Sequence, residues 1–249
     1  MYVYNIRTCP KKDIPERIKN NKKEKNRKIP SVVRWLPLPK AYEDSHSSHP
    51  DLKDLNYFVV VSTIEPRKNH SLLIRVWTRL TKKLGTQAPH LVIVGSMGYK
   101  SMEILDALQT DPLLASRVHQ ISGLSSPSLA SLVLGASGML CPSLVEGFGL
   151  PVLEGKAMGV PVLASDIEAH REIGTSDTLF FSPDDDQAWE KAILGVPECG
   201  SRLRPDIPQQ ITEETYAKDI IDLVRAEASK VEASKMAQLV KLAEREIAN

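Results

Sequence analysis

Ser143-Leu-Val-Glu-Gly-Phe-Gly-Leu-Pro-Val-Leu-Glu-Gly-Lys-Ala-Met-Gly159 is the stretch that decides how this chain folds. It follows an apolar run at 138–142, which is typical of a buried strand that ends at a proline. A Gly-Phe-Gly turn at 147–149 then leads into a segment with helical spacing. Pro151 suits the first position of that helix, because an N–H there would have no partner. The pattern predicts a strand, a glycine loop and a helix start, whose backbone N–H groups favour phosphates and sugar hydroxyls.

Two carboxylates flank this turn. Glu146 lies just before it, and Glu154 lies about one turn into the helix. Because a helix rises ~1.5 Å per residue, we expect both side chains to face the same cleft. Carboxylates accept hydrogen bonds from sugar diols. The alternative is that Glu154 complements the helix dipole and Glu146 is a solvated loop residue, but their joint position around the turn favours a ligand site.

A family resemblance appears at this point. The segment Glu146-Gly-Phe-Gly-Leu-Pro-Val-Leu-Glu154, followed by Ala157-Met-Gly-Val-Pro-Val162, resembles the Glu-x7-Glu signature of retaining glycosyltransferases with the GT-B fold, in the large family 4 group. Gly155-Lys156 departs from the pattern at a packing position. The resemblance covers 32–225 and implies the C-terminal, donor-binding half of such an enzyme. Since residues 1–30 are too few for the acceptor half, we expect a missing N-terminal half or a separate acceptor-domain chain.

Composition narrows the class of protein. The 249 residues, 42% of them hydrophobic, suit one large or two small domains with a real core. A net charge of +1 gives no overall field for a polyanion, so we expect no nucleic-acid partner. The three cysteines show neither metal nor disulfide spacing, which predicts free thiols in a reducing cytosol: Cys9, Cys141 and Cys199. No run approaches the ~20 apolar residues of a membrane-spanning helix, and no signal-peptide core is present. We therefore expect a cytoplasmic protein.

The chain divides into three segments. Residues 1–52 form an N-terminal basic segment and interdomain linker, 53–229 a nucleotide-sugar-binding Rossmann-like domain, and 230–249 a C-terminal helix. The basic run at 11–28 is typical of a solvated helix end or link. The alternative is a patch for anionic lipid, which would give the protein peripheral contact with the cytoplasmic face of a membrane.

The central segment predicts an α/β fold. Its strand and helix patterns alternate, which indicates a Rossmann-like parallel sheet with helices on both faces. Right-handed crossovers place the carboxyl ends of the strands on one edge, where ligands bind in such sheets. The expected strands are 57–61, 90–94, 118–121, 139–141, 161–164 and 179–181, and the expected helices include 69–84 and 128–134.

Two adjacent cations follow the first strand. In Thr63-Ile-Glu-Pro-Arg-Lys-Asn69, Arg67 can make forked contacts with a diphosphate and Lys68 can act as a point charge. The alternative is a pair of surface cations beside a helix capped by Asn69. The stretch resembles the diphosphate-binding loop of a mannosyltransferase-like subgroup, which favours GDP-mannose as the donor. Many relatives carry an arginine where Thr63 stands, so Arg67 would supply that charge.

The resemblance also implies roles at the site. Arg67 and Lys68 stabilise the diphosphate leaving group, Glu146 holds the transferred sugar with its oxocarbenium-like transition state, and Glu154 holds the ribose. Further donor contacts are implied for the turn and two other loops: Gly147, Phe148, Gly149, Leu150, Thr63 and, at the nucleotide base, Leu124. Retention of anomeric configuration, no metal and no cofactor are implied as well. The substrates would be a nucleotide-diphosphate sugar and a glycan or lipid-linked acceptor.

Other signals carry less information. Gly95 and Gly98 after the second strand suit either a plain turn or the close approach of a ligand. The aspartates at 184–186 look like metal ligands, but we expect them to cap the helix carrying Trp189 and Ile193. The six histidines show no metal spacing and are expected to be surface or packing residues.

Two other classes of protein remain as alternatives. One is a non-catalytic sugar-nucleotide-binding scaffold or sensor, which would bind the donor without turnover even beside a partner chain. The other is a dinucleotide-dependent oxidoreductase. It is disfavoured because no Gly-x-Gly-x-x-Gly follows the first strand, and NAD binding would test it.

Overall fold

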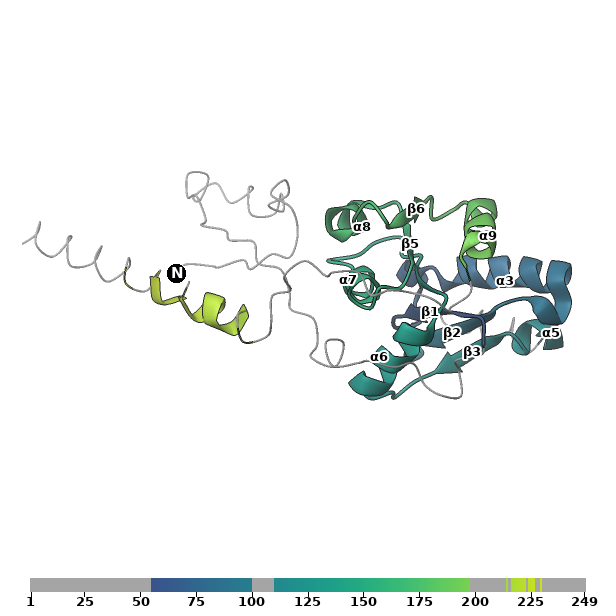
Figure 1. Ribbon diagram of the computed structural model, residues 1–249, viewed down its shortest axis with the longest axis horizontal. Helices are drawn as coiled ribbons and strands as arrows, with labels where there is room; N and C mark the ends of the chain where they lie inside the picture. Colours follow the sequence, from purple (N-terminus) through teal and green to yellow (C-terminus); the bar gives the residue numbers. More distant parts are fainter. Residues whose placement is uncertain are drawn as a thin grey trace, which may run out of the picture.

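The structure is a computed structural model that describes residues 55–99 and 110–197, together with residues 214, 216–222, 224–226 and 229 of a further helical stretch. The expectations for the basic segment and linker, the C-terminal helix, Cys9 and Cys199 lie outside the described residues. The described residues within 214–229 are helical, and Figure 1 shows them apart from the sheet.

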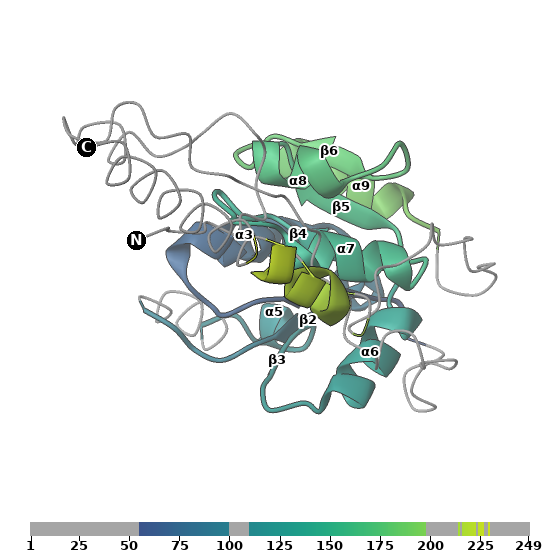
Figure 2. The same cartoon turned by 90° about the vertical axis from the view of Figure 1, so that its left-hand side faces the viewer.

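A six-stranded parallel sheet forms the centre of the molecule (Figure 1). Its strands are β1 (Tyr57–Val61), β2 (His90–Val94), β3 (Val118–Ile121), β4 (Gly138–Cys141), β5 (Val162–Ser165) and β6 (Leu179–Phe181), in the order β3-β2-β1-β4-β5-β6. All five neighbouring pairs are parallel. Figure 2 labels five of these strands, which follow one another from bottom to top as β3, β2, β4, β5 and β6. The predicted α/β, Rossmann-like sheet is confirmed.

The strand order places a crevice between β1 and β4. The chain first builds outward from β1 to β3 and then returns to the other side of β1 with β4. At such a reversal the loops after the two central strands diverge to opposite faces, and ligands bind in the crevice between them. The loops that follow β1 and β4 are the two that the sequence singles out.

The central strands β1 and β4 are apolar throughout because both faces of the sheet are covered there, whereas the edge strand β3 carries the exposed His119 and Gln120. In β1, Phe58 and Val60 belong to one buried cluster, and Tyr57 and Val59 belong to another. The alternation follows from the two-residue period of a strand. Buried parallel strands of this kind are the simplest for sequence to predict, and four of the six have the predicted bounds.

The first face of the sheet is covered by α3 (His70–Leu84), α5 (Pro112–Ala115) and α9 (Asp186–Gly195). The largest side chains of this cluster are Trp77 and Trp189, both fully buried. Each indole N–H finds a backbone oxygen, Trp77 donating to Pro89 (2.8 Å) and Trp189 to Ser182 (3.0 Å). Buried indoles usually need such partners, so both rings are fixed as well as packed.

The second face is covered by α6 (Ser126–Gly135), α7 (Leu150–Ala157) and α8 (Glu168–Ile173). Figure 1 shows these helices on the left of the sheet, and Figure 2 places β4 between α3 and α7. A Cβ on Gly155 would lie 2.8 Å from both Met139 Sδ and Val162 Cγ2. The departure from the family pattern at this residue is therefore a packing feature that brings α7 close to the sheet.

Some predicted bounds are shifted. Helix α7 begins one residue earlier than expected, with Gly149 as its cap, so Pro151 is the second helical residue. Helix α6 begins before the predicted 128 because the Ser125 side chain caps the N–H of Ser128. Strand β5 starts and ends one residue later than predicted. The short helices α5 and α8 have too few residues for a periodic signal and were not predicted.

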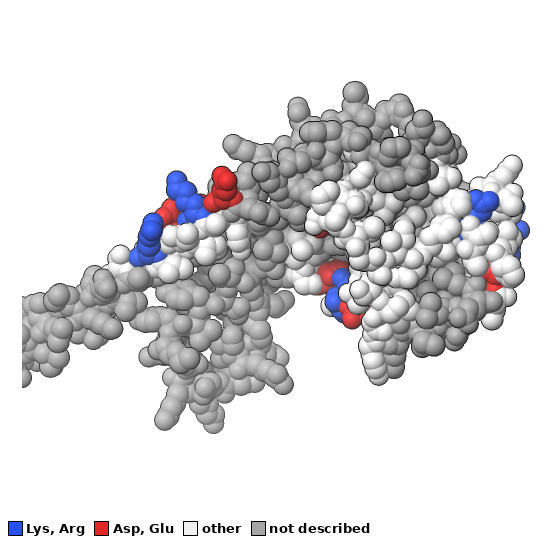
Figure 3. Space-filling model, turned by 90° about the horizontal axis from the view of Figure 1, so that it is seen from below, with Lys and Arg blue, Asp and Glu red and all other residues white. Residues whose placement is uncertain are grey.

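The molecular surface over α6 carries few charges. None of the ten residues of α6 is charged, and Figure 3 shows mostly white side chains on the described part of this face. Within the described residues, no helix combines the length and the apolar character that crossing a bilayer requires. The charged residues that matter for the site lie at the carboxyl edge of the sheet.

Candidate active site

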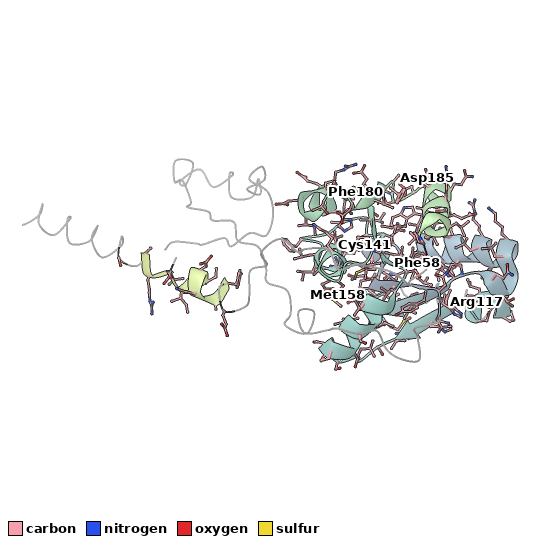
Figure 4. The ribbon with its side chains drawn as sticks, in the orientation of Figure 1. Phe58, Arg117, Cys141, Met158, Phe180 and Asp185 are labelled. Atoms are coloured by element: carbon pink, nitrogen blue, oxygen red, sulfur yellow. The ribbon has the colours of Figure 1, made fainter. Side chains whose placement is uncertain are left out.

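A small pocket opens at the carboxyl edge of the sheet, where β1 and β4 end side by side. Figure 4 shows the polarity: Cys141, at the end of β4, lies well to the left of Arg117, which precedes β3. The pocket is shallow, since its volume of about 240 Å³ includes open solvent at its mouth. Its lining comes from β1, β4 and the segments that follow β1, β4 and β5: Val60, Val61, Ser62, Leu140, Cys141, Pro142, Ser143, Glu146, Pro151 and His170.

Three predicted site residues meet at this pocket. Lys68 Nζ lies 2.5 Å from Glu146 Oε1, and Arg67 NH1 lies 3.7 Å from Glu146 Oε2. Arg67 also pairs with Glu65 at 2.5 Å. The side chains of Lys68 and Glu146 are only 11% and 9% exposed, whereas Arg67 is 51% exposed. The structure therefore joins residues 78 positions apart into one triad of a carboxylate and two cations.

Glu146 is held in its ionised form. Burial would raise the pKa of its carboxyl group, but hydrogen bonds from Lys68 and Ser143 and the positive charge of Lys68 outweigh burial and place the pKa below the ordinary value. The Ser143 hydroxyl donates to Oε1 at 2.7 Å. The carboxylate is thus fixed by two donors at the mouth of the pocket.

Asn69 ties three loops of this edge together. It is the only non-glycine residue of the described chain with positive φ, at 55°. Its side-chain amide donates to the carbonyl oxygens of Pro142, at 3.1 Å, and Pro183, at 2.9 Å. The side chain makes no capping bond to α3, so the alternative of a helix capped by Asn69 is wrong in that detail. Asparagine fits because it tolerates the left-handed region and carries two donors.

The glycine turn has one open side and one closed side. A Cβ on Gly147 would meet nothing within 4 Å, whereas a Cβ on Gly149 would lie 3.0 Å from the His170 ring and from Ile173. Gly149 also has φ +89°, which side chains rarely adopt. Phe148 packs against the second core cluster, and Leu150 is 37% exposed. The turn is anchored at Gly149 and open to solvent at Gly147.

Glu154 and Glu146 approach the end of β4 together. Glu154 is half-buried in α7. The thiol of Cys141 is fully buried and its pKa is raised, first by burial and then by the negative charges of Glu154 and Glu146. Both carboxylates therefore act electrostatically on one buried atom, but only Glu146 lines the pocket. The expected shared cleft stays a prediction. Cys141 itself is a free thiol, as predicted.

Two predicted contacts lie in other loops of the same edge. Thr63 is exposed in the loop after β1, and Leu124, 36% exposed, follows β3. Since β2 separates β1 from β3 in the sheet, Leu124 is farther from the triad than Thr63. The structure places both residues on the carboxyl edge and gives neither a contact with Glu146.

The glycines after β2 serve the packing of the loop after β1. A Cβ on Gly95 would lie 1.9 Å from the Ser62 carbonyl oxygen, and one on Gly98 would lie 2.8 Å from the Ile64 oxygen. Hydrogen bonds continue the β1–β2 pairing here, from Ser62 N to Val94 O and from Ile64 N to Ser96 O. The close approach that these glycines permit is that of a neighbouring backbone.

Of the three aspartates at the start of α9, Asp185 caps the helix as expected. The Asp185 side chain caps the Ala188 N–H at 3.0 Å, and Asp186 makes two hydrogen bonds to Arg75 of α3, at 2.8 and 2.9 Å. Within residues 55–99, 110–197 and the described part of 214–229, no group of three or more His, Cys, Asp or Glu side chains could hold a metal ion.

Several site residues carry no signal that sequence reasoning used. Ser143 orients Glu146, and Asn69 joins the loops. His70 is buried, with Nε2 3.2 Å from the Ser62 hydroxyl of the pocket, and burial followed by the charge of Lys68 lowers the pKa of His70 to about 4. His170 is buried as well and lines the pocket. A histidine shortly after a strand end was the available clue for both rings.

The comparisons with known proteins agree with this architecture. Residues 42–218 match the family model described as glycosyl transferases group 1. The chain is 32% identical over 151 residues to the O-antigen chain mannosyltransferase RfbU of Salmonella typhimurium, covering 59% of this chain and 41% of that protein. It is 30% identical over 125 residues to the serotype-specific mannosyltransferase WbdA of Escherichia coli, covering 50% of this chain and 15% of that protein. The chain thus spans less than half the length of both relatives.

Solved structures share the fold. Sucrose-phosphate synthase from Thermosynechococcus elongatus superposes with a TM-score of 0.65 at 20% identity, covering 80% of this chain and 53% of the other. HepE of Anabaena, in complex with UDP-glucose, superposes with a TM-score of 0.55 at 15% identity, covering 66% and 47%. In both cases this chain corresponds to about half of the larger molecule.

Proposed function

Because this chain belongs to the glycosyl transferases group 1 family, we propose that it binds a nucleotide-diphosphate sugar at the carboxyl edge of its sheet. In this proposal it is the donor-binding half of an enzyme that transfers a hexosyl group to a glycan or lipid-linked acceptor. The acceptor half is a missing N-terminal half or a separate chain. The short span of this chain relative to RfbU and WbdA supports that division.

The triad of Lys68, Arg67 and Glu146 carries the proposal. Two cations converge on one carboxylate at the crevice where the strand order reverses. A diphosphate presents the same kind of acceptor oxygens to these cations, with more negative charge. Donor binding would therefore transfer Lys68 and Arg67 from the carboxylate to the diphosphate. There they would stabilise the charge that develops on the leaving group.

The same exchange would free Glu146 for the sugar. Its carboxylate remains bonded to Ser143 and would accept hydroxyl groups of the transferred hexose and offset the positive charge of an oxocarbenium-like transition state. N–H groups of the open turn at 147–150 would assist at the phosphate. In this proposal Glu154 holds the ribose, while Thr63 and Leu124 complete the nucleotide site. Retention of configuration without a metal or cofactor belongs to the same proposal.

GDP-mannose is the proposed donor. RfbU and WbdA are both named as mannosyltransferases, and RfbU is named for the O-antigen chain. By this likeness we propose polysaccharide biosynthesis as the process and a growing or lipid-linked glycan as the acceptor. A cytoplasmic protein with peripheral contact to the inner face of the membrane would meet both substrates.

Calorimetric titration of the full 249-residue chain with GDP, UDP, TDP and ADP tests the proposal. We expect one nucleoside diphosphate to bind, and both Lys68→Ala and Glu154→Ala to weaken it. The first substitution removes a phosphate contact and the second a ribose contact, so deoxynucleotides should be less sensitive to Glu154→Ala. Binding that is unchanged in both variants would overturn the assigned site. Absence of binding to all four diphosphates would contradict the donor-half function for this chain.

A further inference from the structure

His170 is a buried polar side chain at the pocket for which the proposed function has no use so far. It lies in α8, shortly after β5, and is 1% exposed. Its ring lines the pocket together with Glu146 and Pro151. It also lies against the glycine turn, because a Cβ on Gly149 would be 3.0 Å from its Cδ2 and 3.6 Å from its Nε2.

One hydrogen bond fixes the tautomer of this ring. Nδ1 of His170 lies 3.0 Å from the carbonyl oxygen of Ser165. A carbonyl oxygen only accepts, so Nδ1 must carry the hydrogen and donate it. In the neutral ring Nε2 therefore has a lone pair and is an acceptor. Among the described residues, Nδ1 alone of the two ring nitrogens has a hydrogen-bond partner.

The ring is neutral under ordinary conditions. Burial lowers the pKa of His170 most strongly, and the charge of Lys68 lowers it further. The hydrogen bond to Ser165 and the charge of Glu146 oppose this without reversing it. A lone pair cannot pair with a phosphate oxygen, which has no hydrogen to give. The group that suits Nε2 is a hydroxyl donor, and the position of the ring at the lining of the pocket lets a ligand reach this atom.

We infer that Nε2 of His170 accepts a hydrogen bond from a hydroxyl of the transferred sugar, beside the hydroxyl groups that Glu146 holds. This assignment rests on the proposed function, since it places the hexose at the open mouth of the pocket, where Glu146 and His170 both line it. His170 is then a specificity residue for the sugar and not for the nucleotide. A donor whose sugar lacks that hydroxyl loses this hydrogen bond and binds less tightly.

The test compares donors with and without the sugar. The full-length wild type, His170→Asn and His170→Gln are titrated with GDP and GDP-mannose, and in parallel with UDP and UDP-glucose. Asparagine retains a donor for the Ser165 carbonyl but does not reach the position of Nε2. Glutamine places an amide oxygen near Nε2. We expect His170→Asn to lose about three- to tenfold in affinity for the sugar nucleotide, with less than a twofold change for the diphosphate, and His170→Gln to recover part of the loss.

Monodeoxy GDP-mannoses, or the matching UDP-glucose analogues, identify the hydroxyl. One deoxy analogue should weaken wild-type binding by the same factor as His170→Asn and cause no further loss in that variant. Equal losses for the diphosphate and the sugar nucleotide would overturn the inference and leave the proposed function standing. Additive losses for every deoxy analogue would overturn it too. Failure of the wild type to bind either pair would overturn both.

Discussion

Among the described residues, two triads of one carboxylate and two cations can be compared, and they differ in where the fold places them. At the carboxyl edge, Glu146 pairs with Lys68 and Arg67. Between α3 and α9, Glu190 pairs with Arg79, at 2.8 Å, and with Lys83. The two carboxylates are nearly equally buried, with side chains 9% and 6% exposed. Local chemistry alone does not separate them.

The supporting elements do separate them. The cations of the second triad stand on one face of α3, one turn apart, and hold α9 against that helix. The cations of the first triad stand in a 3-10 turn, η2 (Pro66–Lys68), and their carboxylate stands in a loop beside a pocket. The charges between the two helices hold those helices together, and none of their residues lines the pocket. The charges at the pocket can exchange their partner for a ligand. The same residue types therefore predict stability in one place and binding in the other.

Lys68→Met should have the largest effect of the substitutions that probe this contrast. It removes a nearly buried cation while keeping most of the side-chain volume. Loss of a charge-assisted contact to the diphosphate should weaken binding by about 1.5–3 kcal/mol, or roughly ten- to hundredfold. Calorimetry with the diphosphate that binds the wild type measures this.

Lys83→Met is the matched control from the second triad. Lys83 is 59% exposed and lies on the face of α3 that meets α9, so diphosphate affinity should stay within a factor of two. Equal weakening by Lys83→Met and Lys68→Met would show that the two triads do not differ in function.

Asn69→Ala should destabilise the fold by about 2 kcal/mol. It leaves the carbonyl groups of Pro142 and Pro183 without their amide donor, and it keeps a left-handed backbone that alanine disfavours. Asn69→Gly relieves the backbone term but not the lost hydrogen bonds, so its midpoint in urea unfolding should lie between those of the wild type and Asn69→Ala. A glycine variant as stable as the wild type would show that the two hydrogen bonds contribute nothing.

Glu190→Gln should destabilise the fold by about 1 kcal/mol without changing diphosphate affinity. Arg79 and Lys83 are partly exposed and regain water when their partner is neutralised, which keeps the loss small. Urea unfolding and calorimetry on the same protein sample separate the two readouts. A tenfold weaker diphosphate affinity would mean that the α3–α9 contact supports the site directly.

The smallest expected effect is a pH dependence from Glu146. Its pKa in the fold is lowered by Lys68 and Ser143 despite burial, so its contribution to the free energy of unfolding is complete above its ordinary pKa and is lost as the pH falls through the lowered value. Wild type should exceed Glu146→Gln in stability at neutral pH, by about 1 kcal/mol or less, and the difference should shrink as the pH falls below the ordinary pKa of a glutamate carboxyl group.

Subtracting the free energy of unfolding of Glu146→Gln from that of the wild type removes the contributions that both proteins share. The buried His70 is one of these: its pKa of about 4 lies below the ordinary value, so the unfolded chain takes up the proton first and stability falls between pH 6.5 and about 4 in both proteins. A difference that grows as the pH falls would contradict the assignment to Glu146.

The sequence predicted the centre of the sheet well because β1, β2 and β4 are almost wholly buried and read as apolar runs. It also predicted that Glu146, Arg67 and Lys68 share one edge, since parallel strands align their carboxyl ends. It did not reveal that these three side chains pair with one another, because pairing depends on loop conformation. The left-handed Asn69 and the direction of the His170 ring depend on contacts with segments that are distant in sequence. The roles of Gly95 and Gly98 were ambiguous because the residues next to a glycine in sequence do not indicate which group approaches it in the fold.

The bonding between the loops after β1 and β2 also has a consequence for amide exchange. The N–H groups of Ser62 and Ile64 donate to Val94 and Ser96, and the N–H of Gly98 donates to Ile64, beyond the ends of both strands. Gly95 leaves no room for these loops to slide, since its Cα hydrogen already faces the Ser62 carbonyl group. These amides should exchange with deuterium at rates close to those of β1 itself, because they open only when the sheet does. The turn that carries Arg67 and Lys68 thus follows a backbone segment whose amides should exchange as slowly as those of the core.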